Sequence, residues 1–234
     1  MMLAMGLFLA IFMPVMITWR GGSTRPLPEV AKPFIGTGTV VMVLFALLQL
    51  VCNQFGCDRD GFRSLMLLPT PRERLLFGKN LALMPLAYAI ALLPLVAVSV
   101  FAKLSVMVVL ATGLQLAAAF FIFCAIGNLA SILMPYRIAA GSLKPSKQSW
   151  RIQLLMLLVH FLFPLAIAPV FIPPVVGLVA QRWAGLPAGL VNFLTALVLF
   201  GGFALVYWVT LCPLGRLLQR RETRILRAVT EAAE

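Results

Sequence analysis

The hydrophobic pattern of the chain is a series of long apolar stretches, separated by short segments that hold the charges. Six stretches contain no Lys, Arg, Asp or Glu, and each is 19 to 33 residues long. A helix needs roughly 20 apolar residues to cross a bilayer, and the stretches lack the alternation that is typical of strands. The sequence therefore predicts an all-α fold, a polytopic membrane helical bundle with six transmembrane helices in a single domain of residues 1–234. The predicted spans are about 1–19, 34–57, 80–102, 108–136, 152–168 and 190–211.

The fifth charge-free stretch contains a cluster of prolines that a straight helix does not accommodate. Pro164, Pro169, Pro173 and Pro174 fall within eleven residues. Each proline removes a backbone donor and disturbs the preceding turn. We expect a span that ends near residue 168, and then short broken or re-entrant pieces at the outer face before the last span.

The segment 58–79, between the second and third spans, has the pattern of two helical pieces joined by a bend. Phe62, Leu65 and Met66 are spaced as i, i+3 and i+4, which predicts a short amphipathic helix that starts at Asp58 or Asp60. Prolines at positions 69 and 71 stop it. The run 70–73 then reads as a capping box with proline at the first helical position, from which a helix continues into the third span. Physical reasoning leaves two interpretations of this segment open. It is either an interfacial helix that anchors the bundle or a docking site for a soluble partner.

Composition excludes several classes of protein. Hydrophobic residues make up 62% of the chain and charged residues 11%, against roughly 45–50% and 25% in a soluble domain. This excludes a soluble enzyme, a disordered tail and a secreted disulfide scaffold. The first stretch lacks the basic start of a signal peptide, which favours a retained span. Because the sequence begins inside apolar material, a fragment of a longer protein is a second interpretation.

The basic residues are distributed by topology. Fourteen of the 19 Lys and Arg residues lie in 58–79, 137–151 and 216–234, and five lie in the alternate segments. Basic residues concentrate in cytoplasmic loops, so we expect both termini and the 58–79 segment in the cytoplasm, and the protein in the plasma membrane of a prokaryotic cell. The net charge of +12 is then explained without nucleic acid. The segment 216–229 predicts a basic amphipathic helix, for which a position on anionic lipid is favoured over a partner-binding role.

The chain holds little that could catalyse a reaction. No Asp or Glu occurs between Glu73 and Glu222, and His160 is the only histidine. A proton- or sodium-driven carrier usually places ionisable groups in its spans, and a lone histidine there is more often packed and hydrogen-bonded than a proton relay. The four cysteines form no metal-binding pattern. We therefore predict no catalytic, cofactor-binding or metal-binding residues.

Neutral polar residues in the spans have two interpretations. Gln115, Asn128 and Asn192 are candidates to line a translocation path. Interhelical hydrogen bonding is the favoured interpretation for any one of them.

Several segments together resemble the permease subunits of type-two ABC exporters. They are the run 53–63 (Asn-Gln-Phe-Gly-Cys-Asp-Arg-Asp-Gly-Phe-Arg), Leu68-Pro69, the run 72–82 that begins Arg-Glu-Arg and contains Gly-Lys-Asn, and the run 128–137 that ends Pro-Tyr-Arg. In architecture the resemblance covers about residues 34–215, and in motif some 40 residues. Members of that family commonly have a cytoplasmic amphipathic helix before the first span, which this chain lacks; the chain is then incomplete or half of a longer, two-part permease.

The resemblance implies a function in which the chain itself is not an enzyme. The stretch around 58–68 would be a coupling helix that contacts a separate, soluble ABC ATPase subunit, and two permease units would pair as a homodimer or heterodimer. The residues expected to couple to the ATPase are Asp58, Arg59, Asp60, Gly61, Phe62, Arg63, Leu65, Arg72 and Arg74. The alternatives are a non-transporting membrane scaffold that assembles other proteins, and a polytopic lipid-modifying enzyme, which the scarcity of acids disfavours.

Overall fold

The chain folds as a bundle of long apolar helices. The computed structural model describes residues 12, 28–138 and 150–230, and within these it is helical without a β-strand. Five segments are long and apolar enough to cross a membrane, which confirms the all-α, membrane-type fold. They are α2 (Lys32–Cys52), α5 (Arg72–Phe101), α6 (Val106–Leu133), the broken helix Ile152–Ala184, and α9 (Ala188–Thr230). The predicted first span, 1–19, lies outside the described residues apart from residue 12.

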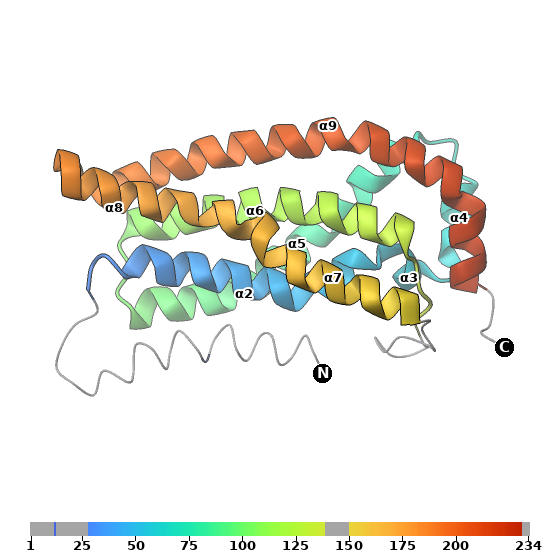
Figure 1. Cartoon of the computed structure of the whole chain (residues 1–234), viewed down its shortest axis with the longest axis horizontal. Coiled ribbons are helices and arrows are strands. Elements are labelled where there is room, and N and C mark those ends of the chain that lie inside the picture. The colour runs from blue at the N-terminus through green and yellow to red at the C-terminus, as the bar shows by residue number, and fades with distance from the viewer. Residues whose placement is uncertain (1–11, 13–27, 139–149, 231–234) are drawn as a thin grey trace.

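The five segments run along the long axis of the molecule in alternating directions (Figure 1). Two short helices, α3 (Gln54–Asp58) and α4 (Gly61–Met66), lie at one end of the bundle together with the last turns of α9. We call this the α4 end. The turns between α5 and α6 and between α8 and α9 lie at the opposite end (Figure 1).

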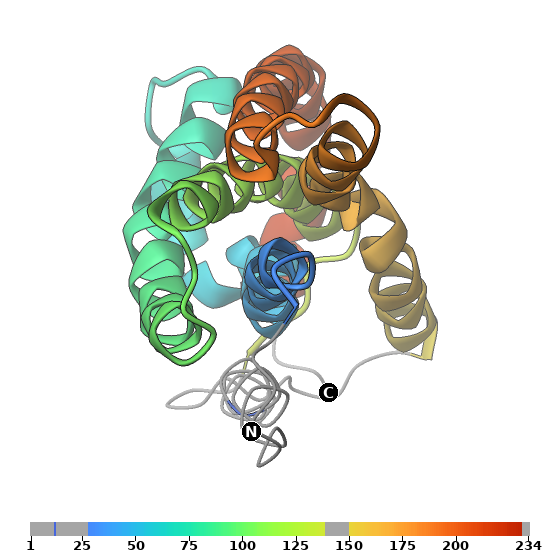
Figure 2. The same ribbon diagram turned by 90° about the vertical axis from the view of Figure 1, so that its left-hand side faces the viewer.

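The interior of the bundle is formed mainly by α2 and α6. Figure 2, which looks along the bundle, shows α2 at the centre and α6 between α2 and α9. In the most apolar part of α2, 56% of the residues are buried, and 50% in α6, but only 11% in α9. The outer faces of α5 and α9 are therefore apolar and exposed, which is typical of helices that contact lipid or another membrane segment.

The proline cluster interrupts the fifth segment, but the segment does not end near residue 168 as predicted, because it continues as one apolar candidate span over Ile152–Ala184. Helix α7 (Trp150–Ile167) is followed by a 3₁₀ turn, η1 (Ala168–Phe171), and then by α8 (Ile172–Ala184). The pieces expected at the outer face are therefore wrong: α8 continues the direction of α7 to the opposite end of the bundle without turning back (Figure 1). The chain reverses only after α8, at Gly185, whose φ of +67° favours glycine.

The last span and the basic tail form one helix. We predicted a span over 190–211 and a separate helix over 216–229, but α9 is continuous for 43 residues. The reason is that its buried face continues through the charged region, with Leu211, Leu214, Leu218, Ile225 and Val229 at spacings of three, four or seven. The last turns of α9 cross the α4 end (Figure 1).

The bend in segment 58–79 forms as predicted, but its cap does not. Helix α4 spans Gly61–Met66, and α5 begins at Arg72 and continues into the third span. The predicted capping box is wrong, because the cap position is Pro71, with ψ of 138° and no side-chain hydrogen bond. Proline has no side-chain oxygen to accept one, and Thr70 lies one residue too early.

Candidate coupling site at the α4 end

Helix α4 packs its apolar face against its own bundle. Phe62 is fully buried, and its ring meets that of Phe55 in a T-shaped contact with centroids 5.1 Å apart. Leu65 and Met66 are half-buried against the same core. We call residues 58–74, which contain α4 and the bend into α5, the elbow. Its amphipathic pattern packs it onto the bundle, with Phe62 buried and Leu65 half-buried.

Arg72 ties the elbow to α9. Its Nε donates to Glu222 Oε1 at 2.5 Å, and its terminal nitrogens donate to the carbonyl oxygens of Met66 at 3.0 Å and Leu68 at 3.3 Å. Those carbonyls lie at and just after the end of α4, where helical partners are missing. A single guanidinium therefore closes α4 and links it to the basic end of α9.

A second ion pair holds the other side of the elbow to α5. Lys79 Nζ lies 2.5 Å from Asp58 Oδ2 and 5.5 Å from the centre of the Phe55 ring. Burial raises the pKa of the neighbouring Cys57 thiol; Asp58 adds to the rise, and Lys79 and Arg59 oppose it. Arg59 itself has a φ of +51°, a left-handed conformation that turns the chain between α3 and α4.

The remaining predicted contact residues form the outward face of the elbow. Asp60, Gly61, Arg63 and Arg74 are exposed. Leu67 is 81% exposed, which is high for a leucine outside the apolar spans. The structure thus divides the predicted coupling residues into an inner set that fixes the elbow and an outer set that a partner could reach.

Next to the elbow, polar residues from the runs 53–63, 72–82 and 128–137 meet in one buried layer. Gln54 Nε2 donates to Asn80 Oδ1 at 3.0 Å and to Asn128 Oδ1 at 3.4 Å, and Asn80 donates to the Tyr207 hydroxyl at 2.7 Å. The Phe55 backbone N–H donates to Ser131 Oγ at 3.1 Å. These residues come from α3, α5, α6 and α9, so the layer connects the elbow to four helices.

The same region is fastened to the segment after α6. Asn53 Nδ2 donates to the Tyr136 carbonyl at 2.8 Å, and the Tyr136 N–H donates to Asn53 Oδ1 at 3.1 Å. A side chain on Gly56 would collide with that carbonyl and with Asn53. Burial raises the pKa of Tyr136 to about 12, with the Cys57 and Cys52 thiols adding to the rise and a hydrogen bond with Asn53 opposing it.

The predicted path residues fall into two separate groups. Gln115 accepts a hydrogen bond from Thr37 at 2.7 Å and donates to Asn192 at 3.2 Å, whereas Asn128 belongs to the layer with Gln54. Thirteen residues of one helix, or about 20 Å, separate Gln115 from Asn128. All three predicted residues are at most 1% exposed. Their contacts match the interhelical interpretation, and a role in a path stays a prediction.

His160 packs within the bundle, as the sequence favours. The imidazole Nδ1 of His160 lies 2.6 Å from the Met156 carbonyl, and its ring packs edge-on against Phe45. Within residues 28–138 and 150–230, no three His, Cys, Asp or Glu side chains gather as a metal site would require. His160 is thus a packed histidine of the kind expected from the sequence.

Three residues of the site escaped the sequence analysis. Glu222 and Lys79 are the partners of two predicted residues, and Leu67 is the most exposed apolar residue of the elbow. Two signals were present in the sequence. Glu222 is the only acid within the basic stretch 216–230, and Leu67 falls off the i, i+3, i+4 face of α4.

Comparison with known proteins leaves the family open. No protein-family model, curated protein or solved structure matches the chain.

Proposed function

We propose that the chain is the membrane-spanning permease subunit of an ATP-driven ABC exporter, and that it receives mechanical work from a separate ATPase through the α4 elbow. The observation that carries the proposal is the division of the elbow into two faces. The inner face is held to α3 by the contact of Phe62 with Phe55, to α5 by Lys79 and to α9 by Glu222. The outer face presents Arg63, Arg74 and Leu67.

This arrangement is suited to transmit force. A partner that pulls on the outer face displaces α4, and α4 cannot move alone because Arg72 binds both its last carbonyls and Glu222 of α9. The movement also reaches α5 through the Asp58–Lys79 pair. Packed interfaces of this kind respond by shifting as units and not by deforming continuously.

A second permease unit completes the proposal. A translocation path between two such chains needs an apolar face on each, and the outer faces of α5 and α9 offer it. Leu92, Leu93 and Val96 on α5, and Leu205 on α9, are all more than half exposed. The chain supplies no hydrolytic group of its own in this scheme, and ATP hydrolysis belongs to the partner.

The test is purification from native membranes with an affinity tag on the full chain. We expect a Walker-type ATPase to copurify, with ATP hydrolysis that vanadate inhibits. The double variant Arg63→Glu/Arg74→Glu removes the outer charges without touching the inner contacts, so we expect it to lose the ATPase.

Arg182→Glu is the matched control, because Arg182 is exposed in the last turn of α8 at the opposite end. It should retain the ATPase. Purification of a stable, folded chain without any ATPase would reject the proposal and favour the scaffold interpretation, and so would equal retention by the double variant and the control.

A further inference from the structure

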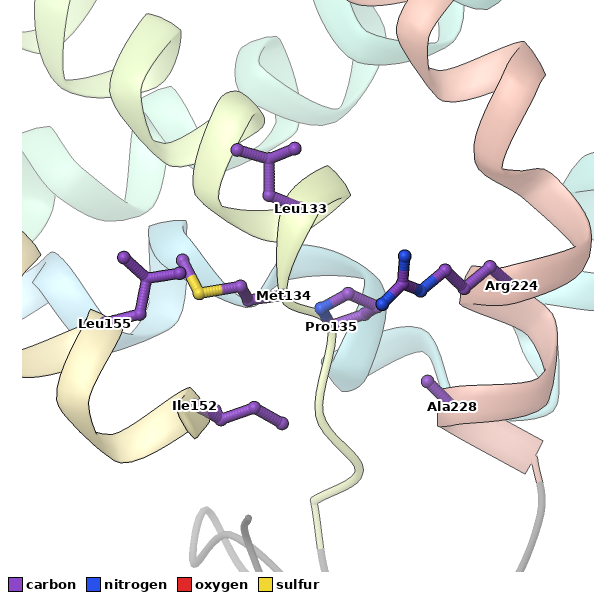
Figure 3. Close-up of a pocket in the computed structure, with 7 residues that line it drawn as sticks. All are labelled: Leu133, Met134, Pro135, Ile152, Leu155, Arg224 and Ala228. Atoms are coloured by element: carbon purple, nitrogen blue, oxygen red, sulfur yellow. The ribbon is translucent and has the colours of Figure 1, made fainter. Parts of the chain in front are cut away.

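A pocket of about 340 Å³ opens at the α4 end, between the end of α6, the start of α7 and the last turns of α9. Figure 3 shows its lining side chains converging from these three elements. Apolar atoms of Leu133, Met134, Ile152 and Leu155 form most of the wall. Among the described residues, Arg224 is the one charged side chain that lines the pocket, and its guanidinium extends from α9 toward Pro135 (Figure 3).

A second apolar groove continues from this pocket along α7. It has a volume of about 450 Å³, and it shares Leu155 with the first pocket. From Leu155 the groove passes Leu158 and reaches Phe161, which is about 9 Å farther along the helix. Trp150, which is 68% exposed, lies at the start of the groove. The two pockets together form one surface that is charged at one end and apolar along its length.

The charge at the α4 end is unbalanced around Arg224. The last turns of α9 carry five arginines, and Glu222, the one acid of these turns, is paired with Arg72. Arg221 reaches the Leu133 carbonyl at 3.4 Å. Among the described residues, no carboxylate lies within ion-pair distance of Arg224. Within residues 28–138 and 150–230, the Arg224 guanidinium thus has no carboxylate as its counter-ion.

We propose that this surface binds an anionic phospholipid, with the phosphate at Arg224 and one acyl chain along α7. A soluble anion would leave the apolar walls exposed, and a zwitterionic lipid brings a phosphate whose charge is offset by the ammonium group of the same lipid. An anionic lipid provides a counter-ion for Arg224 and an acyl chain that covers the apolar walls. Tryptophan at the start of the groove fits a site at the level of the lipid headgroups. This inference does not depend on the proposed transport function.

The site is tested by fluorescence quenching in reconstituted vesicles. The full chain carries Trp150 as its only tryptophan, with Trp19, Trp183 and Trp208 replaced by Phe. The vesicles consist of phosphatidylcholine with a minor fraction of phosphatidylglycerol that is brominated on its acyl chains. We expect stronger quenching than with the same fraction of brominated phosphatidylcholine, because the site concentrates the anionic lipid next to Trp150.

Three variants separate a built site from general attraction between charges. Arg224→Gln should raise the lipid fraction needed for half-maximal quenching about fivefold, the usual effect of one basic residue at an anionic surface. Arg227→Gln removes the same charge from the same exposed tail but lines neither pocket, so it should change that fraction much less. Ala228→Leu keeps every charge and narrows the pocket, so it should also weaken the preference.

The proposal fails if the two brominated lipids quench equally in the parent chain. It fails as well if Arg224→Gln and Arg227→Gln have equal effects, which would mean diffuse attraction to the membrane surface, or if Ala228→Leu leaves the preference unchanged. Circular dichroism of each variant identifies any that is misfolded. Ala228→Val then replaces a misfolded Ala228→Leu, and Arg224→Lys, which keeps the charge, should restore the preference that Arg224→Gln loses.

Discussion

Asn53, which follows the last residue of α2, supplies hydrogen bonds to the backbone of Tyr136. Its amide binds both the N–H and the C=O of Tyr136, as a neighbouring strand would. Gly56 lets the Tyr136 carbonyl approach the backbone of α3 directly. Asn53 thus holds the segment after α6 against the elbow by hydrogen bonds. Gly56 makes this contact possible because it has no side chain.

Gly56→Ala should destabilise the protein. The added methyl group would overlap the Tyr136 carbonyl, which belongs to the backbone, and the buried Asn53 side chain, so we expect a loss of roughly 1–3 kcal/mol. The midpoint of thermal unfolding in detergent measures it. Gly78→Ala is the control, since position 78 is exposed in α5 with open space around it. That change should be neutral or stabilising by up to about 1 kcal/mol. Equal midpoints for the two variants would contradict the close contact at Gly56.

Cys57 should alkylate at higher pH than an exposed cysteine on the same elbow. The thiolate is the reactive form, and burial together with Asp58 raises the pKa of this thiol. We expect the alkylation rate of Cys57, as the only cysteine, to rise at higher pH than that of a cysteine placed by Ser64→Cys, because Ser64 is exposed on α4. The pH dependence of the iodoacetamide reaction gives both values. Coincident profiles would show that Cys57 is not shielded as described.

At the scale of elements, α4 acts as part of α5 and α9 and not as an independent surface helix. Arg72 joins all three, through the carbonyls at the end of α4 and through Glu222. Both side chains of the pair are at least three-quarters buried, 16% and 23% exposed. An ion pair in such a position is less screened by solvent than one on an open surface.

Arg72 and Glu222 should show a favourable coupling in a double-mutant cycle. We expect Arg72→Ala and Glu222→Ala to destabilise the protein by amounts that are not additive, with a coupling of about 1 kcal/mol. Unfolding midpoints of the parent, the two single variants and the double variant measure it. The pair Lys32 and Glu29, in which Glu29 is 81% exposed, provides the comparison and should couple more weakly. Additive effects at Arg72 and Glu222 would mean that the pair does not hold α9 to the elbow.

The sequence predicts these helices better than it predicts which residues elsewhere in the chain they contact. The spacing of Phe62, Leu65 and Met66 and the prolines that follow identify α4 and the start of α5, because both signals are local. The link from Arg72 to Glu222 spans 150 residues, and no local rule contains it. The continuity of α9 was missed because the change from apolar to basic composition looks like a boundary, although the buried face does not change there.

At the scale of the whole molecule, the alternating directions of the helices gather the basic segments at one end. The α4 end carries Arg63, Arg74 and the arginines of the last turns of α9, whereas the opposite end has Lys32, Lys103 and Arg182. This separation of charge follows from the positions of the spans, so the sequence predicts it. The meeting of Gln54, Asn80 and Asn128 in one layer depends on the packing of the helices and could not be read from their spacing.

The α4 end should face the cytoplasm. In otherwise cysteine-free chains, a cysteine from Ser64→Cys should react with a membrane-impermeant maleimide only in inside-out vesicles. A cysteine from Leu186→Cys, in the exposed turn between α8 and α9, should react in intact cells. Labelling of the Ser64→Cys chain from outside would reverse the orientation.

Photo-crosslinking from the tip of the elbow tests the central claim most directly. A photoreactive amino acid in place of Leu67, in the full chain in its native membrane, should give an adduct that contains a soluble ATPase with a Walker-type nucleotide site. The same amino acid in place of Trp183, which is 85% exposed at the opposite end, should give none. Coupling through the elbow predicts the first adduct and not the second. An elbow that crosslinks only to lipid or to its own chain, while the tagged protein is folded and abundant, would contradict the account.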